Sequence, residues 1–340
     1  MSDPEKKLIQ AYAAKIIQGQ MDFLEDQIAD IGRHGDINIL HQTRVISRRV
    51  RNTIEVFARY FGKKNSRKWL SSFSELTKKL TSVRDMDVQI SFLQNELTKV
   101  DNPKVVQGLQ RILLRKTQKR NDSAGLIDKT INKFNETETI KSVREFIVNH
   151  PFVEEEFSTT ASLSSLAIQH IEENIEKCFL HVPFIISATN NKELHKLRKS
   201  IKNLRYTLEL FQYLYPALIE SIDILKTFQD DLGKIHDCDV WIEDLNKFEI
   251  KEKKRIFNFY GQNGAFNFIK PGVDFLRAQI GEARMQAYNQ FLLRWNQSFQ
   301  NQFWAKLRNQ LTAFPIYEDR LPKGLDSLRV PSNQTDLSSK

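Results

Sequence analysis

The same pattern of basic residues occurs twice in this 340-residue chain, and both copies have helical spacing. His41 begins the first copy and His195 the second. In each, basic residues follow at offsets of three, seven and ten: Arg44, Arg48 and Arg51 in the first, and Arg198, Lys202 and Arg205 in the second. Such offsets place side chains on one helix face, within an arc of roughly 80°. Each copy therefore predicts a helix with a continuous cationic face. We call these the first stripe and the second stripe, each including its histidine.

A second motif repeats in step with the stripes. Residues 83–88 read Val-Arg-Asp-Met-Asp-Val, and residues 235–240 read Ile-His-Asp-Cys-Asp-Val. Each lies about 40 residues after its stripe. Two motifs in the same order at nearly the same separation indicate duplication of a unit of roughly 150 residues, far longer than a solenoid repeat. We therefore expect two homologous halves.

The charge of the chain is concentrated at the stripes. The sequence has 51 Lys and Arg against 42 Asp and Glu, a net charge of +9, yet residues 41–51 and 195–205 contain no acidic residue. Such focused charge favours an anionic partner. The two cysteines are too few for a disulfide scaffold and fit a reducing compartment, so we expect a cytoplasmic protein. The N-terminus lacks a signal-peptide pattern and the longest apolar stretch, near residues 179–188, is short, so we expect no membrane segment.

Helical periodicity extends over almost the whole chain, and convincing strand alternation is absent. We expect an all-α fold of two antiparallel four-helix bundles, formed by residues 1–150 and 166–314, with a hinge at 151–165 and a polar C-terminal tail at 315–340. The expected helices are 5–31, 36–61, 66–97, 103–121, 123–134, 137–149, 160–181, 192–214, 217–247, 250–258 and 272–313.

Each stripe helix has an apolar face roughly opposite its cations. The apolar residues are Ile46, Val50, Ile54, Phe57 and Phe61 in the first helix, and Leu197, Ile201, Leu204, Leu208 and Phe211 in the second. This pattern predicts that each helix is anchored in a core on one side and displays Arg and Lys on the other. If the halves pack with pseudo-two-fold symmetry, the stripes would face one another across a basic central groove or pore.

The stripes are open to two interpretations. Solvated helix faces normally mix both signs, whereas these arcs hold no carboxylate to pair with the arginines. Arginine suits a phosphate ligand because its planar fork can bind two oxygens at once. We therefore favour anion binding over a solvated face. His41 and His195 are expected to donate to the same ligand; the alternative is a structural histidine bonded to a backbone group.

The acidic motifs invite a metal interpretation, which their spacing does not favour. On a helix, Asp85 and Asp87 point about 200° apart and make a poor chelating pair, and the same holds for Asp237 and Asp239. Such aspartates more often cap helices or hold nearby arginines in place. We expect no metal and no cofactor. Arg84 and His236 occupy matching positions and would extend the basic surface.

A further basic segment comprises Arg111, Arg115, Lys116, Lys119 and Arg120. It would either widen the anion-binding groove or form a solvated face. The stripes lack the interleaved exposed aromatic residues that stack bases in single-strand nucleic-acid binders. The sequence also contains no phosphate-binding Gly-rich loop, nucleophile elbow or His-Glu-x-x-His motif.

Together these motifs resemble the CHAD family, the conserved histidine α-helical domain. The resemblance covers roughly residues 5–313. It rests on His41-x-x-Arg44-Val45, Arg48-Arg49-x-Arg51, Val83-Arg84-Asp85-x-Asp87-Val88, Leu194-His195-x-Leu197-Arg198, Lys202-x-Leu204-Arg205-Tyr206, Phe228-Gln229-Asp230-x-Leu232-Gly233 and Ile235-His236-Asp237-x-Asp239. One departure is Thr81, where the first half would be expected to carry glycine as Gly233 does in the second; it bears on a local backbone turn.

The resemblance implies two four-helix bundles around a basic groove, binding of inorganic polyphosphate, and association with polyphosphate granules in cells that store it. The expected ligands are the two stripes, with Arg49, Arg84 and Lys199 as a secondary set. Our leading hypothesis is therefore a non-catalytic polyphosphate-binding protein. A nucleic-acid-binding helical protein is the alternative. A metal-dependent phosphohydrolase using His195, His236 and Asp237 is the third hypothesis, although an arginine at position 84 would repel a metal.

Overall fold

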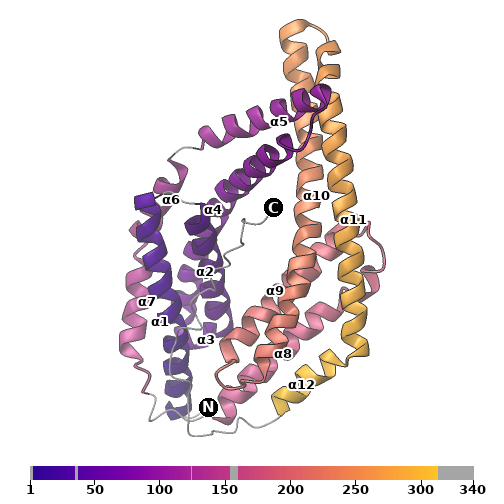
Figure 1. Ribbon diagram of the computed structural model, residues 1–340. Helices are drawn as coiled ribbons and strands as arrows, with labels where there is room; N and C mark the ends of the chain where they lie inside the picture. The colour runs from indigo at the N-terminus through magenta and orange to yellow at the C-terminus, as the bar shows by residue number, and fades with distance from the viewer. Residues whose placement is uncertain (1–2, 35–36, 124, 154–159, 313–340) are drawn as a thin grey trace. The chain divides into compact units, whose positions relative to one another are not determined.

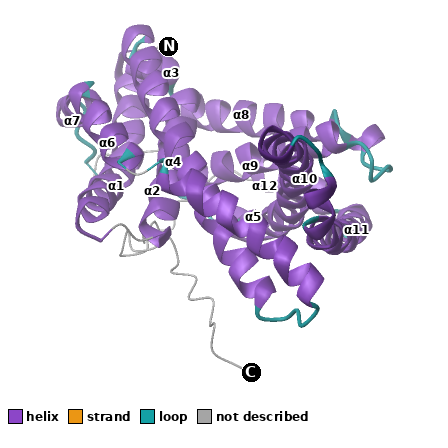
Figure 2. Cartoon of the chain, turned by 90° about the horizontal axis from the view of Figure 1, so that it is seen from above, coloured by secondary structure: helices purple, strands orange, loops and turns teal. Residues whose placement is uncertain are grey.

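The computed structural model describes residues 3–34, 37–123, 125–153 and 160–312. All regular structure in these ranges is helical, and they contain no strand (Figure 2). The all-α prediction is confirmed. No helix within these ranges is both long and apolar enough to cross a membrane. The expected tail at 315–340 and residues 154–159 of the expected hinge lie outside the described residues.

The helices follow the expected order closely (Figure 1). They are α1 (Asp3–His34), α2 (Ile37–Val56), α3 (Ala58–Phe61), α4 (Lys63–Leu97), α5 (Pro103–Asn121), α6 (Leu126–Glu136), α7 (Thr139–Asn149), α8 (Ala161–Phe179), α9 (Asn191–Phe211), α10 (Leu218–Tyr260), α11 (Lys270–Gln300) and α12 (Phe303–Thr312), with short 3₁₀ helices η1 (Val182–Phe184) and η2 (Gly264–Phe268).

Most boundaries agree with the expectation to within three residues, but at three places the helices are divided or joined differently. The helix expected at 36–61 is interrupted at Phe57, whose φ of −98° and ψ of 18° separate α2 from α3. The helices expected at 217–247 and 250–258 form one 43-residue helix, α10, because its buried face continues through Phe248 to Ile256. The helix expected at 272–313 is broken at Gln302, which has a φ of 56° and lets Phe303 and Trp304 turn into the core.

The chain divides into two compact units. In the described ranges, unit 1 contains residues 3–84 and 125–163, and unit 2 contains residues 85–124 and 164–312. The segment 85–124 thus groups with the second unit, and α4 contributes to both. The predicted division into bundles at 1–150 and 166–314, with pseudo-two-fold symmetry, stays a prediction. Of the expected hinge, residues 151–153 lack regular structure and α8 begins at Ala161.

Unit 1 is held by the packing of α1 against α2 and by an aromatic cluster. Phe61 contacts Trp69 with ring centroids 5.3 Å apart and Phe146 at 4.8 Å, so α3, α4 and α7 share one core. Phe73 of α4 packs against Phe134 of α6 at 5.3 Å. Phe57, which follows the last residue of α2, joins this cluster through its contact with Phe61 at 6.3 Å, and so anchors the end of the first stripe helix.

Unit 2 is built on the long pair α10 and α11, which run side by side (Figure 1). One core lies where α9 and α12 pack on α10, around Phe228 and Trp295. Another lies where α5 and the end of α4 meet the pair, around Trp241, Leu109 and Leu276. There Gly108 of α5 lies against Gly272 of α11 so closely that a Cβ on either glycine would fall 2.6 Å from the Cα of the other.

A buried hydrogen bond between two helices occurs at equivalent positions of both units. In unit 1, Thr53 of α2 donates to the amide oxygen of Gln20 of α1 at 2.9 Å. In unit 2, Asn174 of α8 donates to the hydroxyl of Thr207 of α9 at 3.3 Å. Residues 20 and 174 are 154 positions apart, as are residues 53 and 207 and the two stripe histidines. The duplication inferred from the stripes therefore extends to the helix that packs behind each stripe.

Candidate polyanion-binding surface

The first stripe lies on α2, with its apolar face in the core of unit 1. Ile46, Val50, Ile54, Phe57 and Phe61 are all less than 4% exposed, as predicted. His41 is exposed, and Arg48 and Arg51 are half-buried. Arg44 is only 7% exposed, which corrects the expectation that all three arginines are displayed to solvent. The solvent-facing part of the stripe is therefore His41, Arg48 and Arg51.

His41 sits in a strongly positive environment. The pKa of His41 is lowered to about 4, first by desolvation by the surrounding side chains and then by the charges of Arg84, Arg44 and Arg48. Arg84 of α4 therefore lies close enough to His41 for its charge to act on the first stripe; that it contributes to a ligand-binding surface stays a prediction. A bound anion would offset these charges and raise the pKa again.

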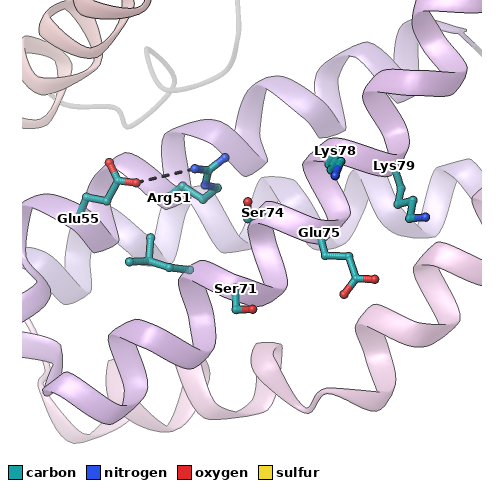
Figure 3. A pocket seen from close by; sticks show the side chains of 8 residues that line it. Arg51, Glu55, Ser71, Ser74, Glu75, Lys78 and Lys79 are labelled. Carbon is teal, nitrogen blue, oxygen red and sulfur yellow. Dashed lines mark ion pairs between the residues drawn. The ribbon is translucent and has the colours of Figure 1, made fainter.

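The first stripe ends beside a surface pocket of about 580 Å³ between α2 and α4 (Figure 3). Arg51, Lys78 and Lys79 line it together with Glu55, Glu75 and three other residues. Arg51 lies 3.8 Å from Glu55 in an exposed ion pair. Lys78 and Lys79 were not among the predicted ligands. Lys78 and Lys79 lie about two helical turns after Ser71, which also lines the pocket, so all three share one face of α4. This spacing identifies them as pocket residues only when that face of α4 is known to lie beside Arg51 of α2.

The second stripe lies on α9 and has the same amphipathic construction. Leu197, Ile201, Leu204, Leu208 and Phe211 are fully buried, as predicted. Arg198 and Lys202 are half-buried, and Lys199 is exposed. Arg205 is only 9% exposed. Its Nε donates to Gln229 at 3.0 Å and its Nη1 to Glu209 at 2.6 Å, while its guanidinium lies over the ring of Tyr206.

The expectation that the stripes have no carboxylate partner is wrong at their C-terminal ends. Glu55 pairs with Arg51 and Glu209 pairs with Arg205, in each case one turn further along the helix. Both glutamates lie fourteen positions after the stripe histidine. The predicted stripes ended at offset ten and so omitted these glutamates, although the sequence shows a glutamate at offset fourteen in both copies.

His195 contacts a second histidine from the next helix. Its Nδ1 lies 3.0 Å from Nδ1 of His236 on α10, and the ring centroids are 4.3 Å apart. This contact favours a side-chain role for His195 over the alternative of a histidine bonded to the backbone. The pKa of His236 is lowered to about 4, first by desolvation and then by the charges of Arg198, His195, Lys199 and Lys202. Desolvation and the neighbouring cations also lower the pKa of His195, against a smaller opposing effect of Asp239.

The aspartates of the repeated acidic motif hold arginines in place. Asp87 accepts from Nε of Arg120 at 2.6 Å, and Asp239 accepts from Nε of Arg284 at 2.6 Å. The structural interpretation of these aspartates is thereby confirmed for one residue of each motif. Within the described ranges, no group of three or more His, Cys, Asp and Glu side chains is arranged to hold a metal ion.

The basic segment on α5 is engaged by acidic residues of unit 2. Arg111, Arg115 and Arg255 converge on Glu252, whose side chain is fully buried. Lys116 pairs with Asp244 at 2.8 Å and lies over the ring of Trp241. Neither of the two predicted roles, a wider groove or a solvated face, describes Arg111, Arg115 and Lys116, which neutralise carboxylates and fix α5 on α10. Lys119 is exposed, as the solvated-face alternative predicts.

Thr81, which stands where glycine was expected from the family resemblance, does not change a backbone turn as we expected. Both Thr81 and Gly233 lie inside continuous helices, so neither forms a backbone turn. The hydroxyl of Thr81 donates to the carbonyl of Thr77 at 2.6 Å. Gly233 lies beside the second stripe, where a Cβ would meet Nε of Arg198 at 3.8 Å. A side chain at this position would therefore make ordinary van der Waals contact with a stripe arginine, so packing does not require the glycine.

Solved structures with a similar fold support the arrangement of helices. The chain is similar to the CHAD domain from the plant Ricinus communis, with a TM-score of 0.56, 17% identity, and coverage of 90% of this chain and 92% of that one. It is also similar to PptA from Streptomyces chartreusis, with a TM-score of 0.60, 12% identity, and coverage of 84% and 99%. No curated protein sequence matches the chain.

The family assignment follows from the sequence match as well as from the fold. The model of the CHAD domain matches residues 15–246, which include both stripes and both acidic motifs. This match covers more than half of the chain, and the similar solved structures agree with it in fold. The chain therefore belongs to the CHAD family.

Proposed function

We propose that this protein binds inorganic polyphosphate without turning it over. The proposed ligands are His41, Arg44, Arg48 and Arg51 of the first stripe and His195, Arg198, Lys202 and Arg205 of the second. Arg49, Arg84 and Lys199 form a secondary set. The CHAD resemblance implies this ligand, and the physical character of both stripes supports it independently.

The observation that carries the proposal is the polarity of the two stripe helices. Each buries its whole apolar face and turns a cationic face away from the core, and neither 41–51 nor 195–205 contains an acidic residue. Like charges at neighbouring helix positions repel one another, so such a face is stabilised by an anion that spans several of them. Polyphosphate is a row of closely spaced negative charges without bases, and a lining of Arg, Lys and His suffices to bind it.

The buried arginines are assigned a different role from the solvated ones. Arg44 and Arg205 are less than a tenth exposed, so they act chiefly through the positive potential that they supply. Arg48, Lys202 and Lys199 are accessible enough to contact phosphate oxygens directly. Replacing accessible residues is therefore the cleaner test, because it removes contacts without disturbing the core.

The experiment is a titration of the full chain with inorganic polyphosphate of defined length, with duplex DNA as competitor at one fixed salt concentration. Polyphosphate is expected to displace DNA, because no exposed aromatic residue interleaves the stripes to stack bases and no groove-reading motif occurs in them. Preferential binding of DNA, or dependence on its sequence, would favour the nucleic-acid alternative and overturn this proposal.

The absence of turnover is tested separately. Incubation with polyphosphate and Mg²⁺ or Mn²⁺ is expected to release no phosphate. Release that is lost on replacing His236 would instead support the phosphohydrolase hypothesis, in which His195, His236 and Asp237 hold the metal.

We also propose that polyphosphate binding localises the protein to polyphosphate granules in the cytoplasm of cells that store the polymer. A fluorescent fusion of the wild-type chain is expected to colocalise with the granules. The same fusion carrying Arg48→Gln and Lys202→Gln is expected to spread through the cytoplasm. Equal colocalisation of both fusions would contradict this role for the stripes.

A further inference from the structure

The contact between His195 and His236 constrains where protons can lie. The two Nδ1 atoms are 3.0 Å apart, a hydrogen-bond distance. A neutral imidazole has one N–H and one lone pair. For two neutral rings to share this hydrogen bond, one Nδ1 must carry the proton and the other must accept it. The ring that donates through Nδ1 then has a bare Nε2, and the ring that accepts has a protonated Nε2.

The neutral pair is therefore poorly suited to an anion that contacts both rings. One Nε2–H can donate to a phosphate oxygen, but the other Nε2 presents a lone pair. A single added proton, placed on that bare Nε2, makes both Nε2 atoms donors and leaves the Nδ1–Nδ1 hydrogen bond intact. The balance is simple: one proton comes from solvent, no bond between heavy atoms changes, and the pair gains one positive charge.

The surroundings keep the free pair neutral near neutral pH. On α9 it is faced by Arg198, Lys199 and Lys202, and on α10 by Asp239, whose carboxylate is engaged by Arg284 of α11. Burial and the three cations disfavour the protonated form, so both histidines have lowered pKa values. A phosphate chain on the second stripe would offset the cations and favour the proton.

The first acidic motif carries a different residue at the matching position. The position that His236 occupies in the second motif is held by Arg84 in the first, and Arg84 is one of the charges that act on His41. Arginine carries its charge at every accessible pH. The two copies of the motif therefore differ in one property: the first has a permanent charge where the second has a group that can gain one.

We propose that the His195–His236 pair takes up one proton when the second stripe binds polyphosphate, so that this stripe binds more tightly as pH falls. The proposal rests on the proposed function. It assigns His236 as a ligand-binding residue and makes the pair, rather than either histidine alone, the proton-binding unit.

The test is calorimetric titration of the full chain with inorganic polyphosphate at pH 7 in buffers of different ionisation enthalpy, which yields the number of protons taken up. Phosphate end groups also titrate near this pH, but they contribute equally for every variant. Wild-type protein is expected to take up more protons per bound chain than His236→Arg, by up to about one, because the charge is permanent in the variant. His170→Gln, which removes a half-buried histidine of α8 remote from the stripe in sequence, is the matched control and is expected to behave as wild type.

The affinity provides a second readout. Between pH 8 and pH 6, wild-type affinity is expected to rise, whereas that of His236→Arg is expected to vary less and to exceed wild type at pH 8. The reciprocal variant Arg84→His, which adds a second titratable histidine beside His41, is expected to increase the pH dependence of binding to the first stripe. Far-ultraviolet circular dichroism and the melting temperature establish that each variant is folded.

The outcomes separate the two proposals. Binding of polyphosphate with the same proton uptake and pH dependence in wild type and His236→Arg would overturn the proton-uptake inference and leave the proposed function standing. No binding of polyphosphate at any pH, by folded wild-type protein, would overturn the proposed function and this inference with it.

Discussion

Arg205 donates from Nη1 to the carboxylate of Glu209 at 2.6 Å, and both side chains are less than 15% exposed. The corresponding pair of the first stripe, Arg51 and Glu55, is longer, at 3.8 Å, and considerably more exposed. The two stripes therefore end in the same ion pair with different strengths. In each, the carboxylate offsets part of the positive potential that its arginine offers to an anionic ligand.

Glu209→Gln is expected to raise the affinity for polyphosphate roughly two- to fivefold, or about 0.4–1 kcal/mol of binding free energy, because it removes a negative charge beside Arg205. Glu55→Gln is expected to have a smaller effect, because its pair is looser and better solvated. Titration at low salt measures both. A fall in affinity for Glu209→Gln, with the fold intact, would mean that Glu209 positions Arg205 for the ligand instead of only offsetting its charge.

The helix-embedded glycines are expected to respond to alanine in opposite directions. Gly108→Ala places a Cβ 2.6 Å from the Cα of Gly272, so α5 and α11 must move apart, at a cost of about 1–3 kcal/mol. Gly233→Ala meets only Arg198 Nε at 3.8 Å, and the better helix propensity of alanine is expected to stabilise the protein by roughly 0.5–1 kcal/mol. Chemical denaturation measures both, and destabilisation by Gly233→Ala would contradict the geometry at that site.

Glu252 makes the stability of unit 2 depend on pH. Burial alone would raise the pKa of Glu252, but hydrogen bonds from Arg115, Arg111 and Arg255 outweigh it and hold the pKa below its usual value. A carboxyl with a lowered pKa contributes stability above its unfolded pKa and loses it as pH falls through the folded value. Glu252→Gln is expected to cost about 1–3 kcal/mol at pH 7, since the arginines remain partly solvated.

The same experiment repeated at lower pH checks the cause. The difference in unfolding free energy between wild type and Glu252→Gln is expected to be constant above about pH 5 and to shrink below about pH 4.5, where the Glu252 carboxyl of the unfolded chain becomes protonated. It is lost as pH falls through the lower pKa of the folded state. A difference that persists unchanged at pH 3 would show that packing, and not charge, holds this cluster. Polyphosphate affinity at pH 7 is expected to be unaffected.

Thr53 and Thr207 make equivalent buried hydrogen bonds in the two units, but replacing each with valine is expected to lower the stability by different amounts. Thr53→Val removes the only hydrogen bond that the structure gives to the amide oxygen of Gln20 among the described residues, and is expected to cost about 1–3 kcal/mol. Thr207→Val is expected to cost less, because Asn174 also donates to the carbonyl of His170 at 2.8 Å. Thermal denaturation compares the two; equal losses would indicate that packing around the threonines dominates.

Much of the fold was predictable because helical periodicity is local information. The apolar faces of α2 and α9 were identified residue by residue, since a helix that is fixed in a core repeats its buried positions every three to four residues. The break at Phe57 and the single long helix through Phe248 were not predicted. Both depend on which side chains the neighbouring helices bury, and that is tertiary information.

The candidate site was predictable in its residue types and less so in its contacts. The stripe register identified His195 and Arg205, but neither the partner of His195 nor the burial of Arg205 follows from spacing on one helix. Those properties arise from the packing of α9 against α10. The role of the basic segment on α5 was not predicted for the same reason, since Glu252 lies 137 positions away from Arg115.

The most direct test of the account is the salt dependence of polyphosphate binding when one accessible cation is removed from each stripe. Arg48→Gln with Lys202→Gln is compared with Lys64→Gln and Lys306→Gln, exposed lysines outside the stripes, which change the net charge equally. The slope of log affinity against log salt is expected to fall in magnitude by about 1.4 for the stripe variant, as for two lost contacts to a single strand of phosphates, and to stay near wild type for the control. Equal changes in both variants, or none in the stripe variant, would contradict the claim that the stripes bind the chain.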